Sequence, residues 1–319
     1  MTELNRRRFL QASAAAALTA GAVSSVSAAP FANAQQRRVL GTVVDYSAGV
    51  PSARSVKAAG HIGAVRYVSE RRPGADWMRG KPVTLRETQD FKANGLATAS
   101  VYQFGRAETA DWKRGAAGAA VHAPQAMRLH AAAGGPTGRP IYVAIDDNPT
   151  LQQFNSLISP YLRAFGVALE TAGYKLGVYG NYWTIAWCLE DRIGSYFWQH
   201  DWGSQGKIHP RANIHQVARW QAHIDGVQVD INNVYAADWG QWTPGSGPTP
   251  APTLTFDDVN RLIQGSSQMS SNALEGAQQA VQGAARNAQQ AAQGAQQAVQ
   301  GAARNAQQAA RDAAARFLP

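Results

Sequence analysis

The fold is decided by the segment Ile-Tyr-Val-Ala-Ile-Asp at 141–146, an apolar, β-branched run that ends on a carboxylate. Successive side chains of a strand point to opposite faces, so Tyr142, Ala144 and Asp146 share one side. Val143 and Ile145 then face the other side, toward helices. The segment predicts a helix-covered strand with a polar group at its carboxyl end.

Seven further runs of β-branched or aromatic residues have the same character. They lie at 39–45, 64–68, 97–102, 175–179, 196–199, 214–217 and 227–231. Helical patterns separate the earlier runs. Thr84 and Glu87 form a capping box before one helix, which Gly95 ends, and Thr150 with Gln153 forms another. Strands alternating with helices predict parallel strands joined by right-handed crossovers.

The strand ends are spaced unevenly along the chain. Their polar residues are Asp45, Tyr67, Tyr102, Asp146, Tyr179, Gln199, Gln216 and Asp230. The first four gaps leave room for a helix, whereas the last two are too short for a regular crossover helix. The spacing therefore predicts a reduced TIM-like (β/α) barrel with eight strands and about five helices. A doubly wound open sheet is the alternative, but no glycine-rich phosphate loop follows the first strand.

Barrel enzymes bind their substrates at the carboxyl ends of their strands. Asp45, Asp146 and Asp230 are expected to meet at one such mouth, and we take them as catalytic candidates. The candidate binding residues around them are Arg66, Tyr102, Gln103, Tyr179, Gln199, Gln216 and Asn232. Each aspartate alone would be interpreted as a helix cap or turn residue. Three at matching strand ends indicate a polar site.

Tryptophan is concentrated at the end of the predicted barrel. Seven of the nine lie at positions 183, 187, 198, 202, 220, 239 and 242. Flat aromatic faces suit the C–H faces of sugar rings. Trp183 and Trp187, spaced four apart on a helix, are interpreted as core residues. Trp198, beside Gln199 at a strand end, is the candidate sugar platform.

Residues 1–34 indicate an export signal. Asn5-Arg6-Arg7-Arg8-Phe9-Leu10 contains the R-R-x-F-L core of a twin-arginine signal, and the Ala-x-Ala motif at 32–34 follows an alanine-rich run. A transmembrane anchor is disfavoured because the run contains serine, threonine and glycine. We expect export by the twin-arginine route, an extracellular or cell-wall location, and no stable membrane span after cleavage.

Beyond the barrel, predicted for 35–242, a Pro/Gly/Ser/Thr linker occupies 243–253 and a tail occupies 254–319. The tail repeats residues 276–293 at 294–311, and 18 residues make five whole helical turns. It is interpreted as a solvated tail that is helical or partly disordered. Self-association, a cell-wall spacer and an interfacial helix are the alternatives.

The chain carries a formal net charge of +9, has 45% hydrophobic residues and contains one cysteine, Cys188. This charge suits an anionic cell envelope, and no basic motif indicates nucleic acid as a partner. A single cysteine excludes a disulfide framework, and we expect a buried thiol.

A third possible chemistry is metal-dependent deacetylation. Its candidate ligands are His200, His209, His215 and His223. Their spacing matches no short ligand motif. A Thr-Phe-Asp-Asp motif at 255–258 has no histidine after it, so Asp257 or Asp258 is interpreted as part of a helix N-cap. We expect no metal and no cofactor.

Several segments together carry a resemblance to a known family. They are GTVVDYSAGV, GAVRYVSERRPG, VYQFG, HAAAGGPT, PIYVAIDDNP, GVYGN, GSYFWQHDWGS and VDIN. Over 38–242 the chain resembles the mycobacterial exported glycoside-hydrolase-like family, which is similar to the family 25 muramidases. The resemblance implies a reduced (β/α) barrel and a cell-envelope protein. It also implies a site built from Asp45, Asp146, Asp147, Gln216 and Asp230.

The chain departs from the muramidase pattern on the central strand. Muramidases carry Asp-x-Glu there, whereas this chain has Ala144-Ile145-Asp146. Two functions follow. The first is a glycosidase acting on a cell-wall glycan of peptidoglycan or arabinogalactan type, with Asp146 as general acid and Asp45 or Asp230 as base or stabiliser. The second is an inactive glycan-binding module that has lost a carboxylate at Ala144.

Overall fold

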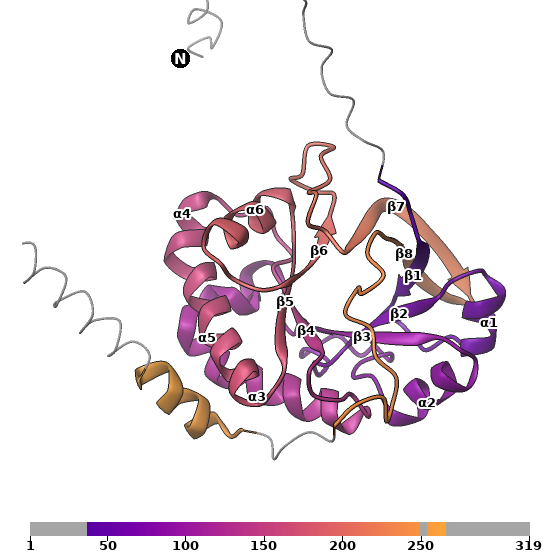
Figure 1. The fold of residues 1–319 in the computed structure, drawn as a ribbon, viewed down its shortest axis with the longest axis horizontal. Helices are drawn as coiled ribbons and strands as arrows, with labels where there is room; N and C mark the ends of the chain where they lie inside the picture. Colours follow the sequence, from indigo (N-terminus) through magenta and orange to yellow (C-terminus); the bar gives the residue numbers. More distant parts are fainter. Residues whose placement is uncertain (1–36, 249–253, 266–319) are drawn as a thin grey trace, which may run out of the picture. The chain divides into compact units, whose positions relative to one another are not determined.

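The computed structural model describes residues 37–248 and 254–265, so the predicted signal at 1–34 and the repeats at 276–311 lie outside the described residues. Within them, eight strands close into a barrel in chain order, which confirms the predicted fold (Figure 1). The strands are β1 Gly41–Asp45, β2 Gly63–Tyr67, β3 Ala97–Tyr102, β4 Pro140–Ala144, β5 Lys175–Gly180, β6 Tyr196–His200, β7 Ile214–Ile224 and β8 Val227–Val234.

Helices occupy the first five connections between strands and lie outside the barrel. They are α1 Ala53–Ala58, α2 Leu85–Ala93, α3 Gly115–Ala132, α4 Leu151–Gln153, α5 Ser159–Thr171 and α6 Tyr182–Glu190. A π-helical turn, Phe154–Ile158, joins α4 to α5. In Figure 1, α3 and α5 lie side by side on one flank. The connections β6–β7 and β7–β8 have no helix, as their short spacing predicted.

Alternating side chains divide the core into inner and outer layers. Val43 and Tyr142 belong to the cluster inside the barrel, whereas Val44 packs with α1 and α2. Val143 belongs to the cluster under α3 and α5. The apolar alternation predicted along the strands is therefore present, and it directs every second residue of a strand into the barrel.

Large aromatic rings fill the interior of the barrel. The ring of Tyr142 lies where a side chain on Gly177 would be, since a Cβ there would come within 2.7 Å of it. The Tyr142 hydroxyl donates to the Trp239 carbonyl at 2.8 Å. The Trp198 Nε1 donates to Asn232 Oδ1 at 2.8 Å. The barrel is therefore packed inside, and polar chemistry is confined to its mouth.

The strands are not all parallel. The six pairings from β1 through β7 are parallel, but β8 is antiparallel to both β7 and β1. The expectation of parallel strands was therefore wrong for β8. The cause is the dipeptide Asp225-Gly226, whose positive φ angles of 51° and 74° form a two-residue hairpin turn. The turn also extends β7 to Ile224, beyond the end predicted for it.

Arg66 lies on the outward face of β2 and is 1% exposed. Its Nε donates to Glu87 of α2, and its other nitrogens donate to the carbonyls of Tyr46 and Gly80. The Tyr46 hydroxyl also donates to Glu87, at 2.8 Å. This buried ion pair joins β1, β2 and α2. Although Arg66 was predicted to bind substrate, its donors are used by the protein itself.

Residues 256–265 form a helix that begins with a capping box. The Asp258 amide donates to Thr255 Oγ1 at 3.2 Å, and the Thr255 amide donates to Asp258 Oδ2 at 2.9 Å. Asp258 is thus part of the N-cap, as expected. Val259 is fully buried in the outer apolar cluster. No helix among the described residues is long and apolar enough to cross a membrane.

Replacing Glu87 by alanine is expected to lower the free energy of unfolding by about 3–5 kcal/mol, because the Arg66 guanidinium stays buried without its carboxylate. Urea denaturation followed by circular dichroism measures the loss. Glu70→Ala is the matched control, since its pair with Arg128 is exposed and contributes about 1 kcal/mol or less. Equal losses in the two variants would contradict the role given to the buried pair.

Candidate active site

Asp45 ends β1 and is 2% exposed. Its Oδ2 accepts hydrogen bonds from Asn232 Nδ2 at 2.8 Å and Gln216 Nε2 at 3.0 Å. The antiparallel register places Asp230 of β8 directly opposite. The same Gln216 nitrogen lies 3.5 Å from Asp230 Oδ2, so one amide bridges the two carboxyl groups. Asp45 and Asp230 meet as predicted, but by strand pairing and not as ends of parallel strands.

Burial and the neighbouring charge of Asp230 raise the pKa of Asp45 to about 8. The hydrogen bonds from Asn232 and Gln216, and the charge of Arg66, oppose this rise without cancelling it. Asp45 therefore holds a proton at neutral pH, which removes the repulsion between its carboxyl group and that of Asp230. Asp230 is half-buried and accepts a bond from Gln221 Nε2 at 2.6 Å.

Asp146 follows β4, and its Oδ2 accepts a hydrogen bond from Gln103 Nε2 at 2.8 Å. Burial raises the pKa of Asp146, and the adjacent Asp147 adds to the rise. The bond from Gln103 and the charges of Arg106 and Lys81 oppose it. A carboxyl group with a raised pKa keeps its proton toward neutral pH, as a general acid must.

Two tyrosines lie between the three aspartates. Burial and the charges of Asp45, Asp146 and Asp230 raise the pKa values of Tyr67 and Tyr179 well above normal, so both stay neutral phenols. The Tyr179 hydroxyl donates to Gln216 Oε1 at 2.5 Å. Asp45 and Asp146 lie two residues beyond the inward-facing Val43 and Ala144, and Asp230 pairs with Asp45, so strand alternation directs the three carboxyl groups to one mouth. Tyr67 was recognised as a strand end but was not among the candidate residues.

A pocket of ≈ 500 Å³ opens beside Asp146. It is lined by Arg106, Ala107, Asp146, Asp147, Asn148 and Trp202. One Asp147 oxygen accepts a bond from Trp112 Nε1 at 2.9 Å. A larger pocket of ≈ 620 Å³ lies along α5; Glu170 lines it, but none of the three strand-end aspartates does, so it is separate from the mouth.

Trp202 presents an aromatic face at this pocket. It is 42% exposed, and its ring stacks on His200 with centroids 3.8 Å apart and planes 16° apart. Burial lowers the pKa of His200 to about 3, so the supporting ring is neutral. Trp198, the platform predicted from sequence, is 2% exposed inside the barrel. The exposed tryptophan at this pocket is therefore Trp202, not Trp198.

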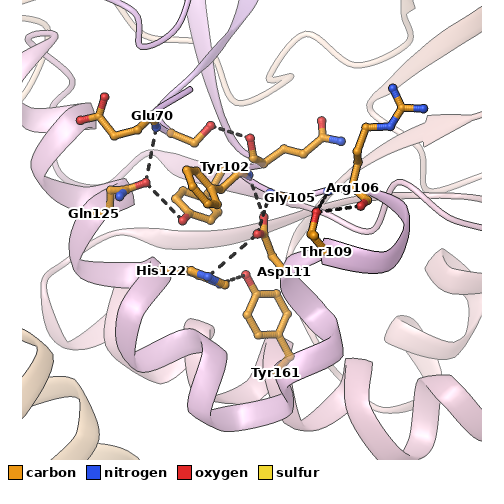
Figure 2. Close-up of polar contacts among 12 residues, drawn as sticks. Glu70, Tyr102, Gly105, Arg106, Thr109, Asp111, His122, Gln125 and Tyr161 are labelled. Atoms are coloured by element: carbon orange, nitrogen blue, oxygen red, sulfur yellow. Dashed lines mark hydrogen bonds and ion pairs between the residues drawn. The ribbon is translucent and has the colours of Figure 1, made fainter. Parts of the chain in front are cut away.

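The loop after β3, which carries Arg106 to the pocket, is fixed by its own hydrogen bonds, as Figure 2 shows. The two oxygens of buried Asp111 accept from the backbone amides of Phe104 and Gly105 at 2.7 and 2.8 Å. The Arg106 amide donates to Thr109 Oγ1 at 3.2 Å. The pocket wall on this side is therefore held in place without any ligand.

Tyr102 and Gln199, like Arg66, are not brought to the mouth. The Tyr102 hydroxyl donates outward to Gln125 Oε1 at 3.2 Å (Figure 2). Gln199 is fully buried; its amide donates to the Lys207 carbonyl at 2.7 Å and its oxygen accepts from the His209 amide at 2.7 Å. In each of these strands the next residue along faces the mouth: Tyr67, Gln103 and His200.

The remaining candidates are the histidines considered as metal ligands and the single cysteine. His215 contacts Asp201 at 2.5 Å, and His223 is exposed on β7. Among the described residues, no group of three or more His, Cys, Asp or Glu side chains is arranged to hold a metal ion. Cys188 is fully buried, as expected, and burial raises the pKa of its thiol.

A closed (β/α) barrel with three carboxyl groups at one mouth defines a glycoside-hydrolase-like domain. The chain belongs to the Rv2525c-like glycoside hydrolase-like domain family, whose model matches residues 54–234. This confirms the resemblance found in the sequence motifs.

One relative from Mycobacterium tuberculosis, Rv2525c, is similar to this chain both in sequence and in its crystal structure. Rv2525c, named as a candidate peptidoglycan hydrolase, is 48% identical over 220 residues, which are 69% of this chain and 89% of that protein. The crystal structure of the Tat-secreted protein Rv2525c with L-tartrate has 49% identity and a TM-score of 0.61, covering 64% of this chain and all of that one. A family 25 glycosyl hydrolase from Bacillus anthracis, at 12% identity and a TM-score of 0.39, is too distant to assign roles to residues.

The stability of the protein is expected to fall as pH rises from about 4 to about 8. The folded state binds the proton of Asp45 more tightly than the unfolded state does, because its pKa is raised from 3.8 to about 8. The stabilisation that Asp45 contributes is complete when the pH is below its pKa in the unfolded state. It is lost as the pH rises toward its pKa in the folded state, by up to about 1.4 kcal/mol per pH unit. Asp45→Asn should flatten this dependence in urea denaturation across the pH range. Parallel wild-type and variant curves would contradict the assignment.

Proposed function

We propose that this is an exported glycoside hydrolase that cleaves a cell-wall glycan of peptidoglycan or arabinogalactan type. The observation that carries the proposal is the mouth of the barrel, where Asp146 has a raised pKa beside an open pocket and faces the Asp45–Asp230 pair. Hydrolysis of a glycosidic bond needs one such acid and one such negative charge.

The chemistry divides between the two parts of the mouth. Asp146 donates its proton to the glycosidic oxygen as the bond breaks. The negative charge of the Asp45–Asp230 pair stabilises the developing oxocarbenium ion or activates water. Because Asp45 retains a proton, the half-buried Asp230 is the better base of the two.

The pocket offers what a sugar ring requires. Trp202 gives a flat apolar face for the C–H side of a pyranose, and Arg106 adds a charged hydrogen-bond donor at the pocket wall. Asp147 and Asn148 add acceptors and donors at the pocket wall. These contacts would hold a glycan across Asp146.

Export would bring the protein to this substrate. The twin-arginine pattern at 1–34 predicts secretion in the folded state. The relative Rv2525c is described as Tat-secreted and as a candidate peptidoglycan hydrolase, which supports both the location and the glycan.

A second candidate function is favoured by one residue. Ala144 occupies the inward position two residues before Asp146, where the resemblance to muramidases implies a carboxylate, and it is 4% exposed. Without that carboxylate the mouth would bind a glycan and leave it intact. The protein would then be a cell-wall glycan-binding module.

Incubation of the mature chain, from Gln35, with purified peptidoglycan and arabinogalactan separates these functions. Release of reducing ends is expected from one glycan, and Asp146→Asn should lower its rate about a hundredfold or more. Asp257→Asn is the matched control, because Asp257 is exposed and lies outside the mouth. Binding without release over prolonged incubation would reject hydrolysis in favour of the binding module.

Trp202→Ala is expected to weaken binding to the same glycan about three- to tenfold, because the variant loses the stacking face. Isothermal titration or pull-down with soluble fragments measures the change. Trp220→Ala is the control, since Trp220 is equally exposed, at 43%, but lies on the β7–β8 hairpin. A loss of affinity in Trp220→Ala and none in Trp202→Ala would reject the platform.

A further inference from the structure

Lys81 is a buried lysine without a carboxylate partner. It is 4% exposed, and its Nζ lies 3.9 Å from the centroid of the Tyr67 ring. Among the described residues, no Asp or Glu oxygen lies within 4.0 Å of this nitrogen. Burying an ammonium group in this way costs free energy that a neutral side chain would not. The position therefore calls for a role that a neutral side chain could not fill.

The contacts of Lys81 lead to Asp146 through one residue. Lys81 Nζ donates to the Gln103 carbonyl at 2.8 Å, and Ser69 Oγ donates to the same oxygen at 2.6 Å. The side chain of Gln103 donates to Asp146 Oδ2 at 2.8 Å. Two donors therefore fix the backbone of the residue that orients Asp146. Only one of those donors carries a charge.

The charge of Lys81 also acts on Asp146 directly, since the two groups influence each other's ionisation. The other charged groups that face Lys81 are Arg66, Arg72 and Asp111. Burial, together with Arg72 and Arg66, lowers the pKa of Lys81 to about 7, against the opposing effect of Asp111 and Asp146. Lys81 can therefore lose its charge in the neutral range. Asp146 itself also faces Asp147 and Arg106.

We propose that Lys81 is a positioning residue for Asp146, which holds the carboxyl group in place through Gln103 and sets its tendency to ionise. This role rests on the proposed function, in which Asp146 is the general acid. While Lys81 is charged, it favours the ionised form of Asp146. When Lys81 loses its proton, Asp146 retains its own proton to higher pH.

The test is a carbon-13 NMR titration of the Asp146 carboxyl group, whose signal Asp146→Asn identifies. Lys81→Met should raise the pKa of Asp146 by about 0.5 or more, because a neighbouring positive charge is lost. Lys81→Arg keeps the charge and should restore a value near that of the wild type. Ser69→Ala, which removes only the uncharged donor to Gln103, should have the smaller effect. An unchanged Asp146 titration in Lys81→Met would overturn the proposal.

The wild-type protein gives a test that does not depend on whether Lys81→Met folds. The Asp146 signal should show a second inflection at the pH where the Lys81 Cε signal titrates, and its absence would overturn the proposal. Neither measurement requires turnover. If the titrations behave as expected but no reducing ends are released, hydrolysis is rejected and the role of Lys81 stands. If reducing ends are released but the Asp146 titration does not respond to Lys81, the role of Lys81 is rejected and hydrolysis stands.

Discussion

Closure of the barrel depends on one reversed strand. The turn at Asp225-Gly226 sends β8 back between β7 and β1, where it forms antiparallel ladders on both sides. No helix is needed for this step, so a barrel with helices in five of its seven connections closes as fully as one with helices in all seven. The same register sets Asp230 opposite Asp45. The hydrogen bonds that complete the sheet therefore also bring two carboxyl groups together.

Burying the adjacent carboxyl groups of Asp45 and Asp230 costs free energy, and their surroundings reduce this cost in two ways. Gln216 and Asn232 donate amide hydrogens to Asp45, and a proton on Asp45 removes one of the two negative charges. Asn232 is in turn oriented by Trp198 inside the barrel. The aromatic core and the polar mouth are thus one connected network, in which Trp198 supports the site from beneath.

The sequence was sufficient to predict the barrel, its eight strands and the strand-end positions of Asp45 and Asp146, because these follow from local alternation and spacing. The direction of β8 was not predicted, although its local cause, the hairpin dipeptide Asp225-Gly226, is present in the sequence. Arg66, Tyr102 and Gln199 were chosen as strand-end polar residues, yet the inward positions are one residue later. Inward alternation from Val65, Val101 and Trp198 indicates those positions: Tyr67, Gln103 and His200. Trp202 could not be distinguished from Trp198, since exposure is a property of the folded loop.

The filled interior of the barrel has a consequence for how a polymer could be handled. Tyr142, Trp198 and Trp239 occupy the space within the strands, so the barrel has no channel through it and is open only at its mouth. A long polysaccharide cannot thread through it and must lie across the rim, arriving and departing by the same opening.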